Sequence, residues 1–516
     1  MGNPLPLPLP LAMAESFTFW FSLSIFLFIL ILILKPKPGT KTKFNLPPSP
    51  PRLPIIGNLH QLGHLPHLSL RRLSHKFGPI ILLRLGQIPT VVISSAKLAK
   101  ATLKTHDLAL CNRPFLISAK HIFYNCTDIA FSPYGSYWRQ IRKIAILELL
   151  SAKRVQSYAS IRQQEVARLV HRVAQSPYPD AVDLSKILLL YANDVLCRVA
   201  LGRDFSGGGE YHLHGFQELL EEFQVLVGGF ILGDLFPSFA FVNTLTGMKS
   251  RLVRTFKGFD RIFDQVIEEH LSPERRSLGE AKDLVDVLLD IQENGSDDKI
   301  QLTMDNVKAI ILDMFVGGTD TTFIILDWGM TELITNPKAM ERAQKEVRSI
   351  VGDRRLVSES DLSRMPYLKA VVKEIHRLHP PVPVLVPRES MEDITIESYD
   401  IPAKTRFFVN AWAIGRDPES WEEPEKFDPE RFIDTDVDFS GQDFEFIPFG
   451  AGRRICPGIT MAIATIELAL AQLLHSFDWE LPNGIEAKDL DMSEVFGITM
   501  HRIQHLEVLA KPYFAS

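Results

Sequence analysis

The residues best suited to do chemistry lie near the C-terminal end, in residues 449–458, which read FGAGRRICPG. They place one cysteine, Cys456, in a glycine-framed loop directly before an apolar run, 459–474, that predicts a helix. Glycines let backbone N–H groups approach a sulfur anion closely, and the positive end of a helix favours thiolate over thiol. The loop therefore predicts that Cys456 is a thiolate metal ligand.

This loop resembles the haem-binding loop of cytochromes P450, whose pattern is Phe-x-x-Gly-x-Arg-x-Cys-x-Gly. The chain has all five fixed positions, at Phe449, Gly452, Arg454, Cys456 and Gly458. A buried structural cysteine in a glycine-rich turn is the alternative. On haem iron, an axial cysteine thiolate pushes electron density toward the metal and favours O–O cleavage.

A second motif lies inside a predicted helix at 303–335, which would span roughly 45 Å. Gly317 and Gly318 precede Asp320 and Thr321 there. Each glycine costs a helix about 1 kcal/mol relative to alanine, so the sequence predicts a close approach or a kink. The resemblance implies that this helix passes over the haem, that Gly317 borders the pocket, and that Asp320 and Thr321 handle protons. A packing notch of small residues is the alternative.

The resemblance also implies a set of cationic and aromatic residues around the haem. Trp138 and Arg142 are four residues apart and share one helix face. An arginine packed on a surface tryptophan would give the same spacing. Buried propionates without such partners would be very costly. The implied cofactor-binding residues are Trp138, Arg142, Arg388, Phe449, Arg454 and Cys456, with Arg113 as a further candidate.

Several weaker motifs follow in the family's order. Glu374 and Arg377 face the same way on a predicted helix at 368–378. The resemblance implies that they form a buried structural pair tied to an arginine of the Pro-Glu-Arg-Phe segment at 429–432. Short strands are predicted at 394–401 and 405–410, and a hairpin at 79–93.

The candidate pocket residues carry no charge, which predicts a largely apolar substrate. A terpenoid is favoured, and a phenylpropanoid, coumarin or alkaloid is the alternative. The candidates are Phe115, Phe123, Phe131, Phe230, Gly317, Val382, Val384, Phe496 and Ile498.

Composition limits the class of protein. The chain has 516 residues, is 46% hydrophobic and carries a net charge of −6, which gives no reason to expect nucleic acid as a partner. Its four cysteines are widely spaced and form no C-x-x-C pair. That usage argues against a disulfide framework and fits a reducing, cytosolic setting.

The N-terminal region predicts a membrane anchor. Residues 17–34 carry no charge and would span roughly 27 Å as a helix, near the thickness of a bilayer core. Lysines follow at 35, 37, 41 and 43, which places the rest of the chain in the cytosol. A cleaved signal peptide is the alternative. We expect an unstructured segment at 1–16, the anchor at 17–34, a basic and proline-rich hinge at 35–58, and a catalytic domain at 59–516.

The resemblance covers about 47–511 and implies the mainly α cytochrome P450 fold with a small β region, behind an N-terminal transmembrane helix. It looks like a plant enzyme of the clan that includes the seventy-one family. Implied are haem b, electrons from NADPH through NADPH-cytochrome reductase, cytochrome b5 as a further partner, and a single-pass location in the endoplasmic reticulum membrane. The implied reaction is monooxygenation of a small apolar substrate. An O2-independent haem-thiolate isomerase or dehydratase, and a non-catalytic membrane haem protein, are the alternatives; the intact Asp320–Thr321 pair argues against the first.

Overall fold

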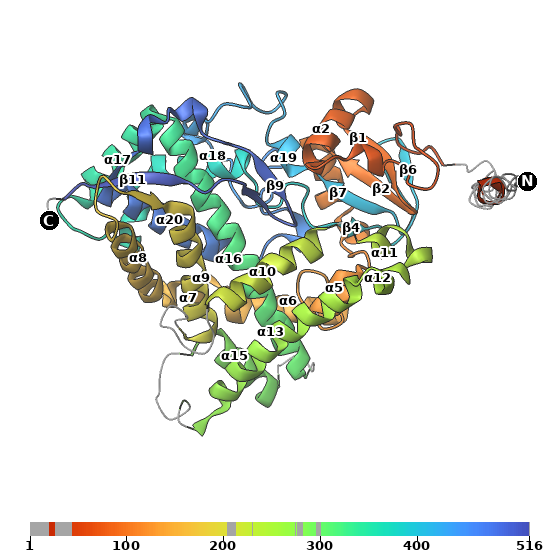
Figure 1. The fold of residues 1–516 in the computed structure, drawn as a ribbon, viewed down its shortest axis with the longest axis horizontal. Coiled ribbons are helices and arrows are strands. Elements are labelled where there is room, and N and C mark those ends of the chain that lie inside the picture. The colour runs from red at the N-terminus through yellow and green to blue at the C-terminus, as the bar shows by residue number, and fades with distance from the viewer. Residues whose placement is uncertain are drawn as a thin grey trace, which may run out of the picture.

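The computed structural model describes residues 20–25, 44–203, 213–229, 231–273, 275, 282–295 and 301–514. Helices make up most of this part of the chain, and short strands lie among them (Figure 1). The helices are α2 (Pro66–Phe77), α3 (Ala96–Lys100), α4 (Asp107–Leu110), α5 (Ile117–Ile122), α6 (Ser136–Ile144), α7 (Ala152–Ser157), α8 (Ala159–Ala174), α9 (Leu184–Leu201), α10 (Leu213–Gly228), α11 (Leu232–Leu235), α12 (Val242–Leu245), α13 (Met248–Leu271), α15 (Leu284–Asn294), α16 (Met304–Thr335), α17 (Pro337–Val351), α18 (Pro366–Leu378), α19 (Ala411–Ile414) and α20 (Ile459–Ser476).

The largest sheet has the strand order β1–β2–β7–β4. Its first two strands form the predicted hairpin, with Leu85 opposite Ile88 beside the turn. The next neighbour, β7, runs parallel to β2 and places Arg406 opposite Thr90. The strands are β1 (Ile80–Leu85), β2 (Ile88–Ile93), β3 (Ala181–Asp183), β4 (Arg388–Glu389), β5 (Ile394–Ile396), β6 (Tyr399–Ile401), β7 (Arg406–Val409), β8 (Phe477–Glu480), β9 (Glu494–Phe496), β10 (Met500–Arg502) and β11 (Glu507–Pro512).

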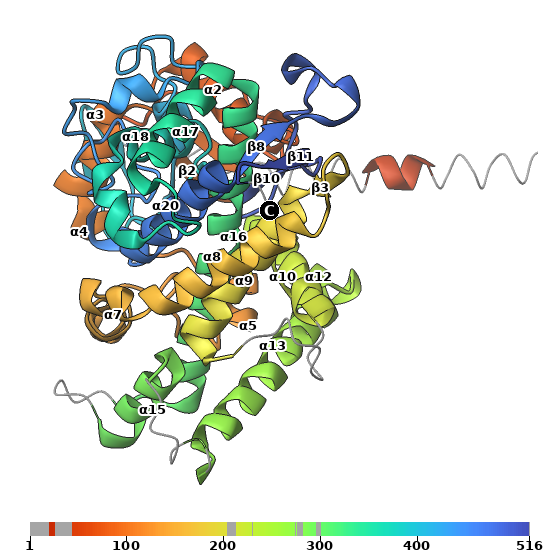
Figure 2. The same ribbon diagram turned by 90° about the vertical axis from the view of Figure 1, so that its left-hand side faces the viewer.

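Helix α16 is the central element and packs against α9, α18 and α20. It begins with a capping box: Thr303 and Asn306 exchange side-chain-to-backbone hydrogen bonds, which satisfies two N–H groups at the start of the helix. Figure 2 shows that α8 and α9 lie between a layer of α17, α18 and α20 and a layer of α13 and α15.

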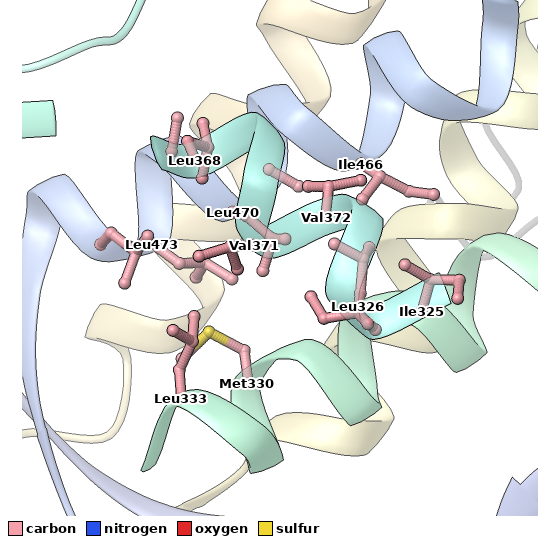
Figure 3. Close-up of a cluster of buried hydrophobic side chains, with 14 of the residues drawn as sticks. Ile325, Leu326, Met330, Leu333, Leu368, Val371, Val372, Ile466, Leu470 and Leu473 are labelled. Atoms are coloured by element: carbon pink, nitrogen blue, oxygen red, sulfur yellow. The ribbon is translucent and has the colours of Figure 1, made fainter. Parts of the chain in front are cut away.

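A cluster of buried apolar side chains lies at the contact of α16, α18 and α20. Figure 3 shows side chains of the three helices pointing toward one another. Leu333, Val371 and Leu470 are each 0% exposed. Each such side chain contributes roughly 1.5–3 kcal/mol on burial, so this contact fixes the position of α16 relative to the loop before α20.

Two helices, α16 and α20, are long and apolar enough to cross a membrane by length and composition. Their most apolar windows are 61% and 72% buried within the protein. Both therefore serve as core helices of the folded body.

The N-terminal predictions meet the structure only in part. Of the predicted anchor at 17–34, residues 20–25 are described and are helical, and the remainder lies outside the described residues. Residues 44–58, which we placed in the hinge, are bound to the folded body. Asn45 donates to the Ser398 carbonyl, Leu82 donates to the Pro48 carbonyl, and Asn58 is 0% exposed. Proline-rich backbone is extended and keeps its carbonyls free, so it binds the sheet edge instead of standing away from it.

Candidate active site

A central cavity of about 320 Å³ separates the Cys456 loop from α16. Cys456 and Phe449 line one side, and Gly317, Gly318 and Thr321 line the other. The fold thus brings the two chemical motifs of the sequence to opposite walls of one cavity. The core contact of Figure 3 holds those walls apart, because α20 continues directly from the loop.

The backbone of the loop is arranged around the sulfur of Cys456. The Cys456 N–H donates to the Phe449 carbonyl at 3.0 Å, and the Gly458 N–H donates to Cys456 Sγ at 3.3 Å. Burial raises the pKa of the Cys456 thiol, while the Gly458 N–H and the charge of Arg142 lower it. A thiolate here needs a cation beside it, which fits a metal ligand.

Gly452 fixes the loop against the preceding part of the fold. Its φ is +70°, and a Cβ atom there would lie 2.2 Å from the Leu103 carbonyl oxygen. The next residue, Arg453, donates through both its backbone and its side chain to Asp107. Only glycine has the backbone freedom and the small size that this position requires.

Four buried arginines converge on the central cavity: Arg113, Arg142, Arg388 and Arg454. Burial lowers the pKa of each, and repulsion from neighbouring arginines lowers those of Arg113 and Arg454 further, the latter to about 10. Their hydrogen bonds go mostly to carbonyl oxygens, which carry no full charge. This excess of positive charge fits the two propionates of a haem, so the residues present match the cofactor that the sequence implies.

Trp138 lies beside this cluster but does not line the cavity. Its indole N–H donates to the Ile129 carbonyl at 3.0 Å, and its ring lies 4.0 Å from the Arg454 guanidinium. In this structure it therefore positions Arg454, which stacks on it. The propionate contact that the resemblance implies for Trp138 stays a prediction, and the Ile129 carbonyl is the partner of its N–H in this structure.

A pair of acids that binds the backbone of residues 129–131 was not predicted from the sequence. Asp313 of α16 lines the central cavity and accepts from the Ile129 N–H. Asp128 accepts from the Phe131 N–H at 2.7 Å. Burial raises the pKa of both carboxyls, that of Asp128 to about 6. The pair holds residues 129–131 against the cavity, and the four-residue spacing from Asp313 to Gly317 was the signal that could have revealed it.

Thr321 and Asp320 lie on different sides of α16. The Thr321 hydroxyl lines the central cavity and donates to the Gly317 carbonyl at 2.6 Å. Asp320 does not line it. One oxygen of Asp320 accepts from Gln224 at 2.9 Å and from the Thr499 hydroxyl, and the other lies 3.6 Å from His501 Nδ1. Burial raises the pKa of Asp320, and His501 and Thr499 lower it.

The two glycines of α16 have separate roles, and the helix continues through both without a break. A Cβ atom at Gly317 would meet nothing within 4 Å, which leaves space in the central cavity. At Gly318 it would lie 3.1 Å from the Leu196 side chain, so this glycine allows α9 to pack closely. The close approach that the sequence predicts is therefore present at Gly318.

A second, outer cavity of about 100 Å³ adjoins the first. Val382, Leu385 and Val386 line both cavities. The predicted pocket residues Phe131, Val384, Phe496 and Ile498 line the outer cavity, while Val382 lines both and Gly317 lines the central one.

Two pocket predictions are corrected by the structure. Phe115 is 63% exposed, and the Lys120 ammonium lies over its ring at 5.5 Å. Phe123 is 1% exposed, but it packs within the core against Phe131 and Phe223. Aromatic residues of one loop alternate between core and surface, which composition alone does not resolve. Phe230, also predicted, lies outside the described residues.

The predicted structural pair forms as expected. Arg377 donates to Glu374 through two nitrogens at 2.7 and 2.8 Å, and Arg431 donates to the same carboxylate at 3.0 Å. Glu374 is 0% exposed, and its full pairing is what makes that burial tolerable.

Known proteins resemble this chain along nearly its whole length. The family described as Cytochrome P450 matches residues 47–506. Cytochrome P450 71AP13 of Prunus mume is 70% identical over 474 residues, 92% of each chain. Strychnine-11-hydroxylase of Strychnos nux-vomica is 49% identical over 469 residues, covering 90% of this chain and 91% of that one. Among solved structures, a zebra fish cytochrome P450 with abiraterone superposes with a TM-score of 0.74 at 27% identity, covering 88% of this chain and 100% of that one.

Proposed function

Because this chain belongs to the cytochrome P450 family, whose members are haem-thiolate monooxygenases, we propose that it inserts one oxygen atom of O2 into a largely apolar plant specialised metabolite. One observation carries the proposal: Cys456 faces Gly317 and Thr321 across a single cavity. The cavity is closed on one side by the Cys456 loop and on the other by α16, where Gly317 leaves open space.

The residues that line the central cavity on the side of Cys456 would hold the cofactor. Cys456 would supply the thiolate that binds the haem iron, and the Gly458 N–H would offset part of the charge on its sulfur. Arg113, Arg142, Arg388 and Arg454 are the proposed partners of the two propionates. When bound, haem supplies the oxidising chemistry, in which one oxygen atom of O2 enters the substrate and the other leaves as water.

Proton handling is assigned to α16. We propose that Thr321 holds a proton at Oγ1 at the cavity wall, where its bond to the Gly317 carbonyl orients the hydroxyl. Asp320, the neighbouring residue, is the proposed proton reservoir behind that wall, since burial raises its pKa.

A terpenoid remains the first candidate substrate, because the side chains lining both cavities are mainly apolar. An alkaloid is the second candidate. It is favoured by the 49% identity to a relative whose name describes hydroxylation of strychnine.

We also propose a cytosolic catalytic domain held at the endoplasmic reticulum membrane by residues 17–34 and supplied with electrons by an NADPH-cytochrome reductase, with cytochrome b5 as a further partner. Helix α6, which lies beside the Cys456 loop, supports a docking face for the electron donor. Arg142 of α6 donates to the Ile455 carbonyl, and Arg139 and Lys143 are exposed on the same helix.

The membrane orientation has its own test. Asn125 and Asn294 stand in acceptor sequences for N-glycosylation, and both are exposed. A cytosolic domain leaves both asparagines unmodified. A glycan on either, seen as a mass shift removed by a glycosidase, contradicts the orientation.

The function is tested with microsomes that contain the enzyme and its reductase, supplied with NADPH and a panel of plant metabolites. Cys456→Ser is expected to abolish product formation and the red-shifted Soret band of the ferrous carbonyl complex. Cys126→Ser, at a half-buried cysteine outside both cavities, is the matched control and should retain both. An unchanged carbonyl band in Cys456→Ser refutes the ligand, and product formed without NADPH indicates the isomerase alternative.

A further inference from the structure

The outer cavity contains a buried charge that the proposed chemistry does not use. Arg406 lies on β7, on the face of the sheet that also carries Leu83, Val92 and Phe408. It is 7% exposed, and its Nε is buried without a hydrogen-bond partner among the described residues. Leaving a guanidinium unpaired on an apolar face is expensive, so the position calls for a partner.

Asp234 of α11 faces the same cavity. One of its carboxylate oxygens accepts from the Ile117 N–H at 2.7 Å. The described part of the chain contains no ion pair between Asp234 and Arg406, although the two charges influence each other. They are the two ionisable side chains among the described residues that line the outer cavity, and the others are apolar or glycine.

The outer cavity adjoins the central cavity. Val382, Leu385 and Val386 form a wall shared with the central cavity. The tip of the C-terminal hairpin, Phe496 to Ile498, closes the outer cavity from another side. We take these shared residues as the point at which a substrate held in the central cavity would extend toward Arg406.

A hydroxyl group matches the two side chains best. It accepts from a guanidinium and donates to a carboxylate at the same time. Burial raises the pKa of Asp234 and the charge of Arg406 opposes this rise, which leaves the pKa at about 6. The carboxyl is therefore ionised at neutral pH. An anionic ligand group would then be repelled by Asp234. The further charged group acting on Arg406 is Glu389 of β4, whose own carboxylate accepts from Lys404 at 3.0 Å.

We propose that the outer cavity is a subsite for a hydroxyl group carried by an otherwise apolar substrate. Arg406 donates a hydrogen bond to the hydroxyl oxygen, and Asp234 accepts a hydrogen bond from the hydroxyl group. The proposal rests on the proposed function, because it names the class of molecule that the same site takes. It predicts that a matched alcohol binds more tightly than the hydrocarbon of the same skeleton.

The test is spectroscopic binding to the purified, haem-loaded full chain, read from the shift of the ferric Soret band toward the high-spin form. The probes are 6-phenyl-1-hexanol, hexylbenzene and 6-phenylhexanoate at neutral pH. We expect the alcohol to bind about tenfold more tightly than hexylbenzene, as the net gain from one hydrogen bond to a charged group suggests. The carboxylate should bind more weakly than the alcohol.

Variants separate the subsite from general packing. Arg406→Met and Asp234→Asn are each expected to remove most of the preference for the alcohol, and Arg406→Lys to restore part of it. Phe408→Leu lies two residues along the same strand and lines the same cavity. It is the matched control, and it should change the affinity for alcohol and hydrocarbon equally.

Several results overturn the subsite. They are an alcohol that binds no more tightly than hexylbenzene, a preference that survives in Arg406→Met, a carboxylate that binds best, and a shift of the opposite sign caused by alcohol on the iron. Absence of any shift with all three probes overturns it as well. If Arg406→Met fails to load haem, the native preference and Asp234→Asn decide. In every case the ferrous carbonyl band of the native enzyme reports separately on the proposed function.

Discussion

The central and outer cavities differ in how their charges are satisfied. In the central cavity, Arg113, Arg388 and Arg454 each donate to two or more oxygens of the chain. In the outer cavity, Arg406 forms no hydrogen bond through its side chain with any described residue. The first arrangement holds one fixed shape, as a permanent cofactor requires. The second leaves its polar group available to a ligand that comes and goes.

The largest effect is expected from straining the Cys456 loop, the part of the central cavity that should be rigid. Gly452→Ala places a Cβ atom against the Leu103 carbonyl, at a φ of +70°. We expect a loss of roughly 2–5 kcal/mol in the free energy of unfolding, from backbone strain and overpacking together. We also expect a lower haem content per chain. Denaturant unfolding and the absorbance ratio of haem to protein measure the two effects.

Gly484→Ala is the matched control for this strain. Its φ is +68°, but a Cβ atom there would meet nothing within 4 Å. It should cost only about 1 kcal/mol, through the left-handed backbone alone, and leave the haem content unchanged. Equal losses in the two variants would show that the contact with Leu103 does not matter.

The next test concerns the charge of the outer cavity. The pKa of Asp234 is about 6 in the folded protein, above its ordinary value of 3.8. A raised carboxyl pKa means that the folded state binds the proton more tightly than the unfolded state does. The stability from this group is therefore greatest at low pH and is lost as pH rises through about 6. Asp234→Asn should remove this loss, which we put at about 1–2 kcal/mol between pH 5 and pH 7.5.

Unfolding titrations at the two pH values, compared between variant and native protein, measure this share. Asp436→Asn, at an exposed aspartate, is the control and should leave the native pH dependence intact. A parallel pH dependence in Asp234→Asn and the native protein would mean that folding does not raise the pKa of Asp234.

The smallest effect is expected at Thr499, in the C-terminal hairpin whose tip lines the outer cavity. Thr499→Val removes the hydroxyl that donates to Asp320. The tip at Phe496 and Ile498 then loses one anchor. Affinity for hexylbenzene, read from the Soret shift, should fall about three- to tenfold.

Thr499→Ser keeps the donor and should bind hexylbenzene as the native enzyme does. If the serine and valine variants lose the same affinity, the methyl packing of Thr499 matters and its hydrogen bond does not.

Features encoded within one short segment were predictable from the sequence. The family and the fold followed from the resemblance that the motifs carry, and the helix α16 followed from its own residues. The hairpin of β1 and β2 followed from strand-like runs, and the pairing of Glu374 with Arg377 followed from their i, i+3 spacing together with the resemblance. In each case the interacting groups are neighbours along the chain or along one helix face.

Features assembled from distant segments were not predictable in this way. Asp320 and Thr321 are adjacent, yet they face different surroundings because Gln224 and Thr499 come from elsewhere in the chain. Arg406 gave no signal, since a strand arginine is ordinarily exposed. Its burial depends on α2 and α11 covering that face of the sheet, which a single sequence does not specify.

The carbonyl contacts of Arg454 have a consequence for biosynthesis. This side chain, from near the end of the chain, donates to Cys111, Ile129 and Ser132, which are translated more than three hundred residues earlier. Those loops remain without their organising cation while the nascent chain emerges. The contacts that Arg454 makes in this pocket can therefore form only after nearly the whole polypeptide has been synthesised.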